Sequence, residues 1–391
     1  KSLEEKSLEE KSLEEKSLEE KSLEESHART DHFLSTLQQA VASRVDTDLK
    51  IAVHVSGGCD SSTVALLASR QNKNIHGFCV EFEETKEGHN ETPVAEKTCR
   101  LLGIPFTPVR VTRMDIVKAW PMALRAAESF GINGHFAAKW LLAKRIHEEG
   151  IRVSLSGEGA DEVLLGYPFL QAEVLDAKTV TAKNPISQGS MLPLDHARLE
   201  GEIVDILGFV PVWLRAKLAF GDRLHALMKK DEISHQKESV KMWGRAAKNL
   251  LPRSNQVHQS ASLWASFALG QYILPALADA PESFFHIQGR MPFLDQRVCK
   301  SAENLLMTDL GFPQKPKEIL RDFLRKNGLS HVADRPKQPF DAPPLLGSPP
   351  VRGYLRDLFL SESYKETVFE KARMEKWINS WDFYSESDCQ H

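Results

Sequence analysis

The chain has 391 residues, of which 41% are hydrophobic and 27% charged, and these shares are typical of a globular protein. Its formal net charge of −4 gives no strong electrostatic attraction to nucleic acid or to an anionic membrane. The five cysteines are widely spaced and form no Cys-x-x-Cys pair, which argues against a zinc site. The sequence shows no signal peptide and no long apolar run, and we therefore predict a cytoplasmic protein without a membrane partner.

The first 25 residues are five copies of Lys-Ser-Leu-Glu-Glu. Leucines at every fifth position are spread about 140° apart around a helix, so they form no apolar stripe that a partner helix could bury. We interpret residues 1–25 as a low-complexity arm that is solvated, helical or a product of repeat expansion.

Apolar patterns from residue 26 onward alternate between the spacing of helices and that of strands. We predict helices over 34–45, after Ser62, over 93–102 and over 136–147, and strands over 51–55, 75–82, 109–111 and 153–155. Short strands separated by helices predict an α/β fold with a doubly wound parallel sheet.

Composition changes suggest where this α/β unit ends. We expect an α/β core over 26–175, a mobile loop over 176–200, a mostly helical lobe without strands over 201–378 and a polar tail over 379–391.

The first strand is joined to its helix by the segment SGGCDSS, residues 56–62. Glycines let the backbone approach a ligand closely, and a helix start attracts anions. A helix cap accounts for one serine or aspartate here, but not for a glycine pair and this run of polar residues. The lysine of a Walker A loop and the third glycine of a dinucleotide fingerprint are both missing. The segment therefore predicts a phosphate-binding loop of another kind.

A second loop of the same character, SLSGEGADEVLLGY, spans residues 154–167 and follows the fourth strand. Ligands bind at the carboxyl ends of strands in an open parallel sheet, so the two loops are expected to face one another. Asp60 and Asp161 would then approach each other, and two carboxylates beside a phosphate loop are suited to Mg²⁺ and a nucleotide.

SGGCDSS resembles the pyrophosphate loop, or PP-loop, of the N-type ATP pyrophosphatases, and SGEGADE with the following Gly166-Tyr167 resembles the second signature of asparagine synthetases and the related β-lactam synthetases. Three further segments match the same family in order: GRMPFLDQRV (289–298), KPKEILRDFL (315–324) and RPKQPFDAPP (335–344). The resemblance covers roughly residues 52–344 and implies an ATP- and Mg²⁺-dependent ligase. Such an enzyme adenylates a small amino-acid-like carboxylate, releases pyrophosphate and lets ammonia or an amine displace AMP.

The resemblance also implies roles for individual residues. Asp60 and Asp161 would hold Mg²⁺, Glu158 would assist the attacking nitrogen as a base, and Lys317 would neutralise charge on the pyrophosphate or on the tetrahedral intermediate. ATP would contact Val55, Ser56, Gly57, Gly58, Asp60, Ser61, Ser62, Val80, Ser156 and Gly157.

Structural explanations compete with some of these roles. Lys317 lies on an amphipathic pattern and fits a solvated lysine, with Lys315 as the competing candidate. Asp295 fits a helix cap or an arginine partner, and His54 fits a core histidine with satisfied nitrogens.

The chain departs from the family at two places, before residue 26 and before Gly289. The sequence shows no glutaminase domain before residue 26, so we expect the nitrogen to come from free ammonia, a partner subunit or an amine already on the substrate. Glu158 stands where β-lactam synthetases commonly carry tyrosine, which favours asparagine-synthetase chemistry. The segment ADAPESFFHIQGR, 278–290, differs from the family around the acyl pocket and favours a carboxylate of secondary metabolism, such as antibiotic biosynthesis, over aspartate.

Other functions stay open at this point. They are an intramolecular, β-lactam-forming synthetase, an RNA-modifying PP-loop enzyme, and a non-catalytic interaction subunit. A homodimer also stays open.

Overall fold

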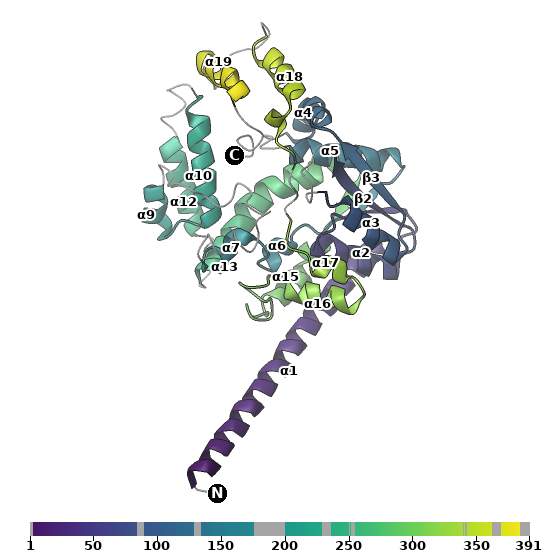
Figure 1. Cartoon of the computed structure of the whole chain (residues 1–391), viewed down its shortest axis with the longest axis vertical. Coiled ribbons are helices and arrows are strands. Elements are labelled where there is room, and N and C mark those ends of the chain that lie inside the picture. Colours follow the sequence, from purple (N-terminus) through teal and green to yellow (C-terminus); the bar gives the residue numbers. More distant parts are fainter. Residues whose placement is uncertain are drawn as a thin grey trace.

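A computed structural model of the chain shows one sheet enclosed by helices, with a long N-terminal helix projecting from it (Figure 1). The structure describes residues 3–83, 90–128, 134–175, 200–228, 236–249, 251, 255–338, 340, 342–361 and 369–383. The expected mobile loop over 176–200 falls almost wholly outside these residues, as does the end of the expected polar tail.

The sheet has five parallel strands in the order β3-β2-β1-β4-β5. The chain builds outward from β1 in one direction through β2 and β3, and then crosses back to place β4 and β5 on the other side. The topological switch point therefore lies between β1 and β4, where ligands bind in sheets of this kind. This confirms the predicted α/β, doubly wound parallel sheet. The strands are β1 (Ile51–His54), β2 (Ile75–Phe82), β3 (Phe106–Val111), β4 (Val153–Leu155) and β5 (Gln288–Arg290).

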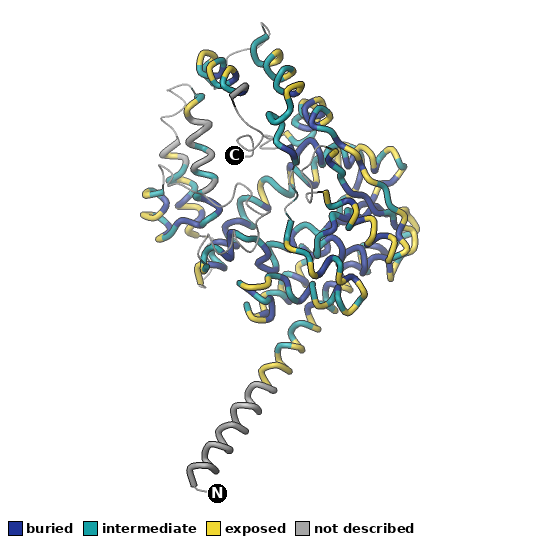
Figure 2. The backbone as a smooth tube through the Cα atoms, viewed as in Figure 1, coloured by how far each residue is buried: buried dark blue, intermediate teal, exposed yellow. Residues whose placement is uncertain are grey.

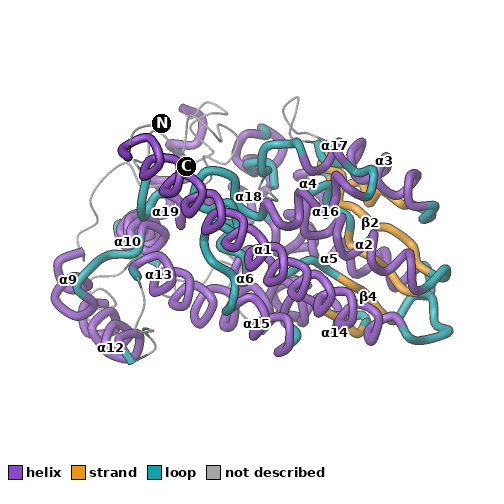
Figure 3. Tube along the Cα trace, turned by 90° about the horizontal axis from the view of Figure 1, so that it is seen from below, coloured by secondary structure: helices purple, strands orange, loops and turns teal. Residues whose placement is uncertain are grey.

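Helices cover both faces of the sheet (Figure 3). Alternating side chains of β1 explain why: Ile51 and Val53 join one apolar cluster with α1 and α2, and Ala52 joins a second cluster with α4 and α5. These helices are α1 (Leu3–Val45), α2 (Cys59–Gln71), α3 (Thr92–Leu102), α4 (Arg113–Ala127), α5 (His135–Glu148), α6 (Ala160–Val163) and α7 (Pro168–Gln171).

Helix α1 carries the repeat and the first part of the fold without a break. Its far end projects away from the body (Figure 1), and residues 21–25 are exposed while the part that reaches the sheet is buried (Figure 2). There Phe33 and Leu37 are fully buried, and Arg29 pairs with Asp309 at 2.7 Å. The helix is thus anchored by its second half.

The chain beyond residue 200 does not form a lobe made of helices alone. β5 lies at the edge of the sheet beside β4, and α16 packs against α2. The prediction of a strand-free segment was wrong because β5 is a three-residue Gln-Gly-Arg strand, too short to show an alternating pattern. The remaining elements are α9 (Glu200–Leu207), α10 (Val212–His225), α12 (Gln236–Lys248), α13 (Gln256–Trp264), the π-helix η2 (Ala265–Asp279), α14 (Ala280–Phe284), η3 (Pro292–Leu294), α15 (Gln296–Ala302), α16 (Glu318–Lys326), α17 (Ser330–Ala333), η4 (Leu345–Gly347), α18 (Pro349–Phe359), α19 (Lys371–Asn379) and η5 (Ser380–Phe383).

Part of the expected polar tail is packed. Trp381 is 1% exposed and forms a small apolar cluster with Met374 and Ile378.

One helical stretch among the described residues, Gln256–Phe284, is long and apolar enough by composition to cross a membrane. It is built from α13, η2 and α14, and it contacts α4, α5 and β5. Trp264 and Leu269 within it are buried. Apolar residues of this stretch therefore pack against the sheet domain.

Candidate functional site

The predicted phosphate loop leaves β1 and turns sharply into α2. Gly57 has φ of 76°, a conformation that favours glycine. The loop is closed by its own serines, since the Ser56 N–H donates to Ser61 Oγ at 3.1 Å. Arg335 supports it from outside by donating to the Gly57 carbonyl at 3.3 Å. The loop is thus held in shape, with the start of α2 beside it.

The second loop, after β4, lies directly against the first. A Cβ atom placed on Gly157 would stand 2.8 Å from the Ser61 nitrogen, a distance that no side chain permits. Glycine at this position therefore lets the two backbones pack together at the switch point.

Four charged side chains meet where the two loops touch. Lys317 Nζ lies 2.6 Å from Asp60 Oδ2 and 2.6 Å from Asp161 Oδ1. Lys337 contacts Asp161 as well, donates to the Gly166 carbonyl at 3.2 Å and lies 4.9 Å from the centre of the Tyr167 ring. Two cations and two carboxylates thus balance in this cluster.

Lys317 is positioned by the backbone that precedes α16. It has φ of 62°, in the left-handed region, and is 5% exposed. A Cβ on Gly166 would lie 2.0 Å from Lys317 Cε, so the glycine leaves room for the lysine side chain. The solvated-lysine interpretation of Lys317 is therefore wrong: its side chain enters the site instead of lying on the surface of α16.

Burial disfavours the charged forms of Lys317, Asp161 and Asp60, and their pairing with opposite charges works against this effect. Burial lowers the pKa of Lys317, but Asp161 and Asp60 outweigh this and raise that pKa above its usual range. Burial raises the pKa of Asp161, but Lys317 and Lys337 hold that pKa well below its usual range. Burial raises the pKa of Asp60, with Lys317 opposing the rise.

The donor atoms fit a magnesium ion. Asp60 Oδ1 is buried and makes no hydrogen bond with the described residues, and the facing carboxylate of Asp161 is a second hard oxygen donor. Among the residues that the structure describes, no group of three or more histidine, cysteine, aspartate or glutamate side chains could hold a metal. An ion at these two aspartates would need further ligands, and Mg²⁺ commonly takes them from water and substrate phosphates.

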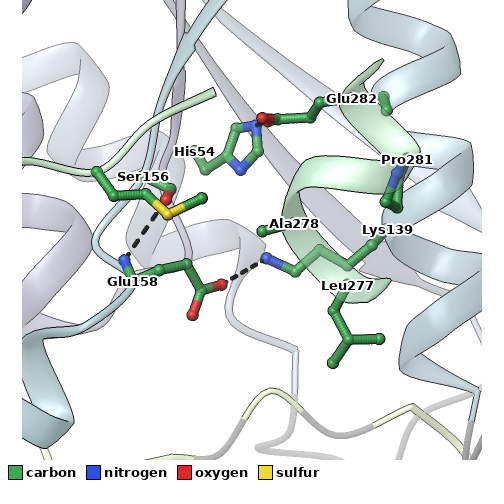
Figure 4. A pocket seen from close by; sticks show the side chains of 10 residues that line it. His54, Lys139, Ser156, Glu158, Leu277, Ala278, Pro281 and Glu282 are labelled. Atoms are coloured by element: carbon green, nitrogen blue, oxygen red, sulfur yellow. Dashed lines mark hydrogen bonds and ion pairs between the residues drawn. The ribbon is translucent and has the colours of Figure 1, made fainter. Parts of the chain in front are cut away.

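Glu158 comes from the same loop as Asp161 but lies in a separate pocket (Figure 4). Its carboxylate pairs with Lys139 of α5, with 2.9 Å between Oε1 and Nζ. Lys139 is held in turn over the Phe340 ring, 5.6 Å from its centre. Glu158 and Asp161 therefore have different neighbours, although only two residues separate them.

A buried acid forms the inner wall of this pocket. Glu282 accepts a hydrogen bond from Ser154 Oγ at 2.6 Å and lies 3.3 Å from His54 Nε2. Burial raises the pKa of Glu282 to about 7, and burial followed by the charge of Lys139 lowers the pKa of His54 to about 3. Neither nitrogen of His54 makes a hydrogen bond with the described residues. The expectation of a satisfied core histidine was wrong, because β1 ends at His54 and points its ring into the pocket.

The remaining candidates are distributed around the two loops. Val55 is fully buried and donates its N–H to the Phe78 carbonyl at 2.8 Å, and Val80 packs on the opposite face of the sheet. Ser156 accepts from the Glu158 N–H at 3.5 Å, and Ser62 Oγ is buried without a hydrogen-bond partner in the described chain. Gly58 precedes the first residue of α2. Asp295 caps α15 and pairs with Arg44 at 2.8 Å, as expected.

Three basic residues of the site were not predicted. Lys337 and Arg335 lie within RPKQPFDAPP, a segment that matched the family but received no role, and this match was the available signal. No sequence signal pointed to Lys139, because a single lysine on an amphipathic helix is ordinarily a surface residue.

The chain is similar to known proteins over most of its length. A family model described as asparagine synthase matches residues 32–390. The chain is 22% identical over 312 residues to the amidase chyE of Penicillium rubens, covering 69% of this chain and 45% of that protein. It is 26% identical over 351 residues to a Mycobacterium bovis protein provisionally named a glutamine-hydrolyzing asparagine synthetase, covering 84% and 49%. The chain thus spans about half the length of these relatives.

Among solved structures, a U34-tRNA thiolase of Methanococcus maripaludis matches 70% of this chain and 89% of its own, with 18% identity and a TM-score of 0.27. A score this low indicates only slight structural correspondence.

Proposed function

Because the chain belongs to the asparagine synthase family, we propose that it is an ATP-dependent carbon–nitrogen ligase that forms AMP and pyrophosphate. A substrate carboxylate attacks the α-phosphorus of ATP, and ammonia or an amine then attacks the activated carbonyl and expels AMP. The observation that carries this proposal is the meeting of Asp60, Asp161 and Lys317 where the two loops touch.

In the first step, the loop over 56–62 binds the phosphates through its backbone N–H groups and the start of α2. Asp60 and Asp161 would hold Mg²⁺, which when bound would neutralise phosphate charge. Lys317 supplies a further positive charge as negative charge develops on the departing pyrophosphate. A lysine buried beside these carboxylates is suited to this role because its pKa is raised and it stays charged.

In the second step, the nitrogen forms a bond to the acyl carbon and must lose a proton as AMP leaves. Glu158 takes that proton as a general base. The position of Glu158 in a separate pocket supports different roles for Glu158 in the second step and Asp60 in the first, since Glu158 pairs with Lys139 and not with the cluster around Asp60.

We extend the proposal to a small amino-acid-like carboxylate other than aspartate, one of secondary metabolism. Glu158 and Glu282 both line the pocket, against the single ammonium of Lys139. Above about pH 7, where Glu282 is ionised, a second carboxylate on a substrate beside this pocket would meet two acids against one ammonium and would be repelled.

The test is exchange of labelled pyrophosphate into ATP, with Mg²⁺, across a panel of amino acids and related acids that includes L-aspartate. We expect exchange with at least one acid, stronger than with aspartate, and AMP as the nucleotide product when ammonium chloride is added. Exchange with no acid, or stoichiometric ADP and phosphate, would refute the proposed reaction. Preference for aspartate would refute only the substrate class.

A further inference from the structure

The two lysines of the site are anchored in different ways. Lys337 has three kinds of partner, namely the Asp161 carboxylate, the Gly166 carbonyl and the Tyr167 ring. Among the residues that the structure describes, Lys317 Nζ pairs with the two carboxylates only, at 2.6 Å each. If both carboxylates were taken by another cation, Lys337 would keep two of its contacts and Lys317 would keep neither.

The ammonium of Lys317 also stands between the two oxygens that a shared metal ion would bind. An ion that contacts both Asp60 and Asp161 needs metal–oxygen distances near 2 Å, as Mg²⁺ does. Lys317 Nζ at 2.6 Å from both oxygens leaves no room for such an ion between them. The ammonium therefore blocks an ion at these two oxygens, and its positive charge disfavours a divalent ion at the neighbouring, unpaired Asp60 Oδ1.

In the free protein, the ammonium of Lys317 stabilises the two carboxylates electrostatically. Asp60 and Asp161 are both half-buried, with side chains 24% and 20% exposed, and without a cation between them they would repel each other. Lys317 removes that repulsion. Moving it away becomes favourable only when new anionic partners appear next to the site.

We propose that Lys317 holds the place of the metal in the free protein, so that Mg²⁺ enters only together with the nucleotide. The phosphate oxygens then replace the two carboxylates as partners of Lys317, while Lys337 stays in place and keeps Asp161 oriented. This inference rests on the proposed metal role of Asp60 and Asp161. It makes the divalent cation site conditional on nucleotide.

The test measures the binding of Mn²⁺, added as MnCl₂ without nucleotide, by the loss of the free-ion signal in electron paramagnetic resonance. The proteins are the wild type, Lys317→Met and the matched control Lys337→Met. We expect Mn²⁺ to bind Lys317→Met about tenfold or more tightly than the wild type, because two carboxylates are left without their shared partner. Lys337→Met should resemble the wild type, since Lys317 still bridges the aspartates.

Lys317→Gln is the second variant, should Lys317→Met fold poorly. Its amide can donate to one carboxylate without a charge, so it should gain Mn²⁺ affinity as well. Thermal unfolding supplies a second measurement: Mn²⁺ should raise the melting temperature of both Lys317 variants more than that of the wild type.

Equal Mn²⁺ affinity in the wild type and the foldable Lys317 variant would overturn the inference, and so would an equal gain in Lys337→Met. Calorimetric titration of the wild type with ATP and MgCl₂ distinguishes a failure of this inference from a failure of the proposed function. A wild type that binds neither ATP alone nor ATP with Mg²⁺ would count against the nucleotide site itself, whatever the variants do with Mn²⁺.

Discussion

The buried carboxyl of Glu282 should make the wild type less stable to unfolding as the pH rises. Replacing Glu282 with glutamine should abolish this decrease. The Glu282 side chain is 7% exposed and faces Ser154, His54 and the more distant charge of Lys139. Burial raises its pKa from the ordinary 4.5 to about 7. Glutamine keeps the shape and the acceptor for Ser154 but carries no charge.

The direction of the effect follows from which state loses its proton first. Below pH 4.5 the carboxyl is protonated in both the folded and the unfolded chain. Burying it then does not lower the free energy of unfolding, so the protein has its full stability. Between pH 4.5 and about 7 the unfolded chain ionises first, so stability is lost until the folded carboxyl ionises too. At about 1.4 kcal/mol per pKa unit, the rise from 4.5 to about 7 corresponds to a loss of up to about 3 kcal/mol.

Urea unfolding of the wild type and Glu282→Gln, followed by tryptophan fluorescence at pH 5 and pH 8, measures this difference. We expect the variant to gain on the wild type by about 2 kcal/mol between the two pH values, because part of the loss is already present at pH 5. Other buried acids, such as Glu91 with a pKa raised by burial to about 8, are present in both proteins and cancel. Glu148→Gln is the control, since its side chain is 50% exposed. A stability difference that does not change with pH would refute the assignment of a strained, buried acid at Glu282.

Three further predictions follow from the site and its glycines. Asp60→Asn should lower pyrophosphate exchange by about 100-fold or more while far-ultraviolet circular dichroism stays unchanged, and a normal exchange rate would remove Asp60 from the site. Glu158→Gln should retain exchange but form amide about 10²–10⁴-fold more slowly, and an equal fall in both rates would assign Glu158 to nucleotide binding. Gly159→Ala should lower the free energy of unfolding by about 1–3 kcal/mol, because Gly159 has φ of 89° and an added Cβ would lie 2.2 Å from Leu294 Cδ2. Combining it with Leu294→Ala should restore part of that loss in urea unfolding, and no restoration would contradict the steric explanation.

The local sequence was sufficient to predict most elements of the sheet domain. The strands β2 and β4 have the predicted bounds, and β1 and α3 differ from theirs by one residue at one end. These elements are decided by side chains close together in the chain, through alternating burial in strands and helical spacing of apolar residues. The two glycine-serine loops could be found for the same reason, since their turns are encoded within a few residues.

Two failures of prediction came where an element depends on distant parts of the chain, whereas α4 was missed although its start carries a local capping box of Thr112 and Asp115. β5 is too short to carry a periodic signal and exists as a strand because β4 pairs with it. Helix α16 was expected in a separate lobe, but its apolar side packs against α2 and thereby brings Lys317 into the site.

The sequence by itself therefore determined the α/β class, the candidate phosphate loop and the set of candidate carboxylates. Only the tertiary structure decided which charges meet. Lys317 and Asp60 are 257 positions apart, and Lys337 and Asp161 are 176 apart, so no local pattern could pair them. The pairing of Glu158 with Lys139 and of Glu282 with Ser154 likewise depends on which helix covers which face of the sheet. Local propensities act over a few residues, whereas the partner of a buried charge is fixed by strand order and by the burial of apolar helix faces against that sheet.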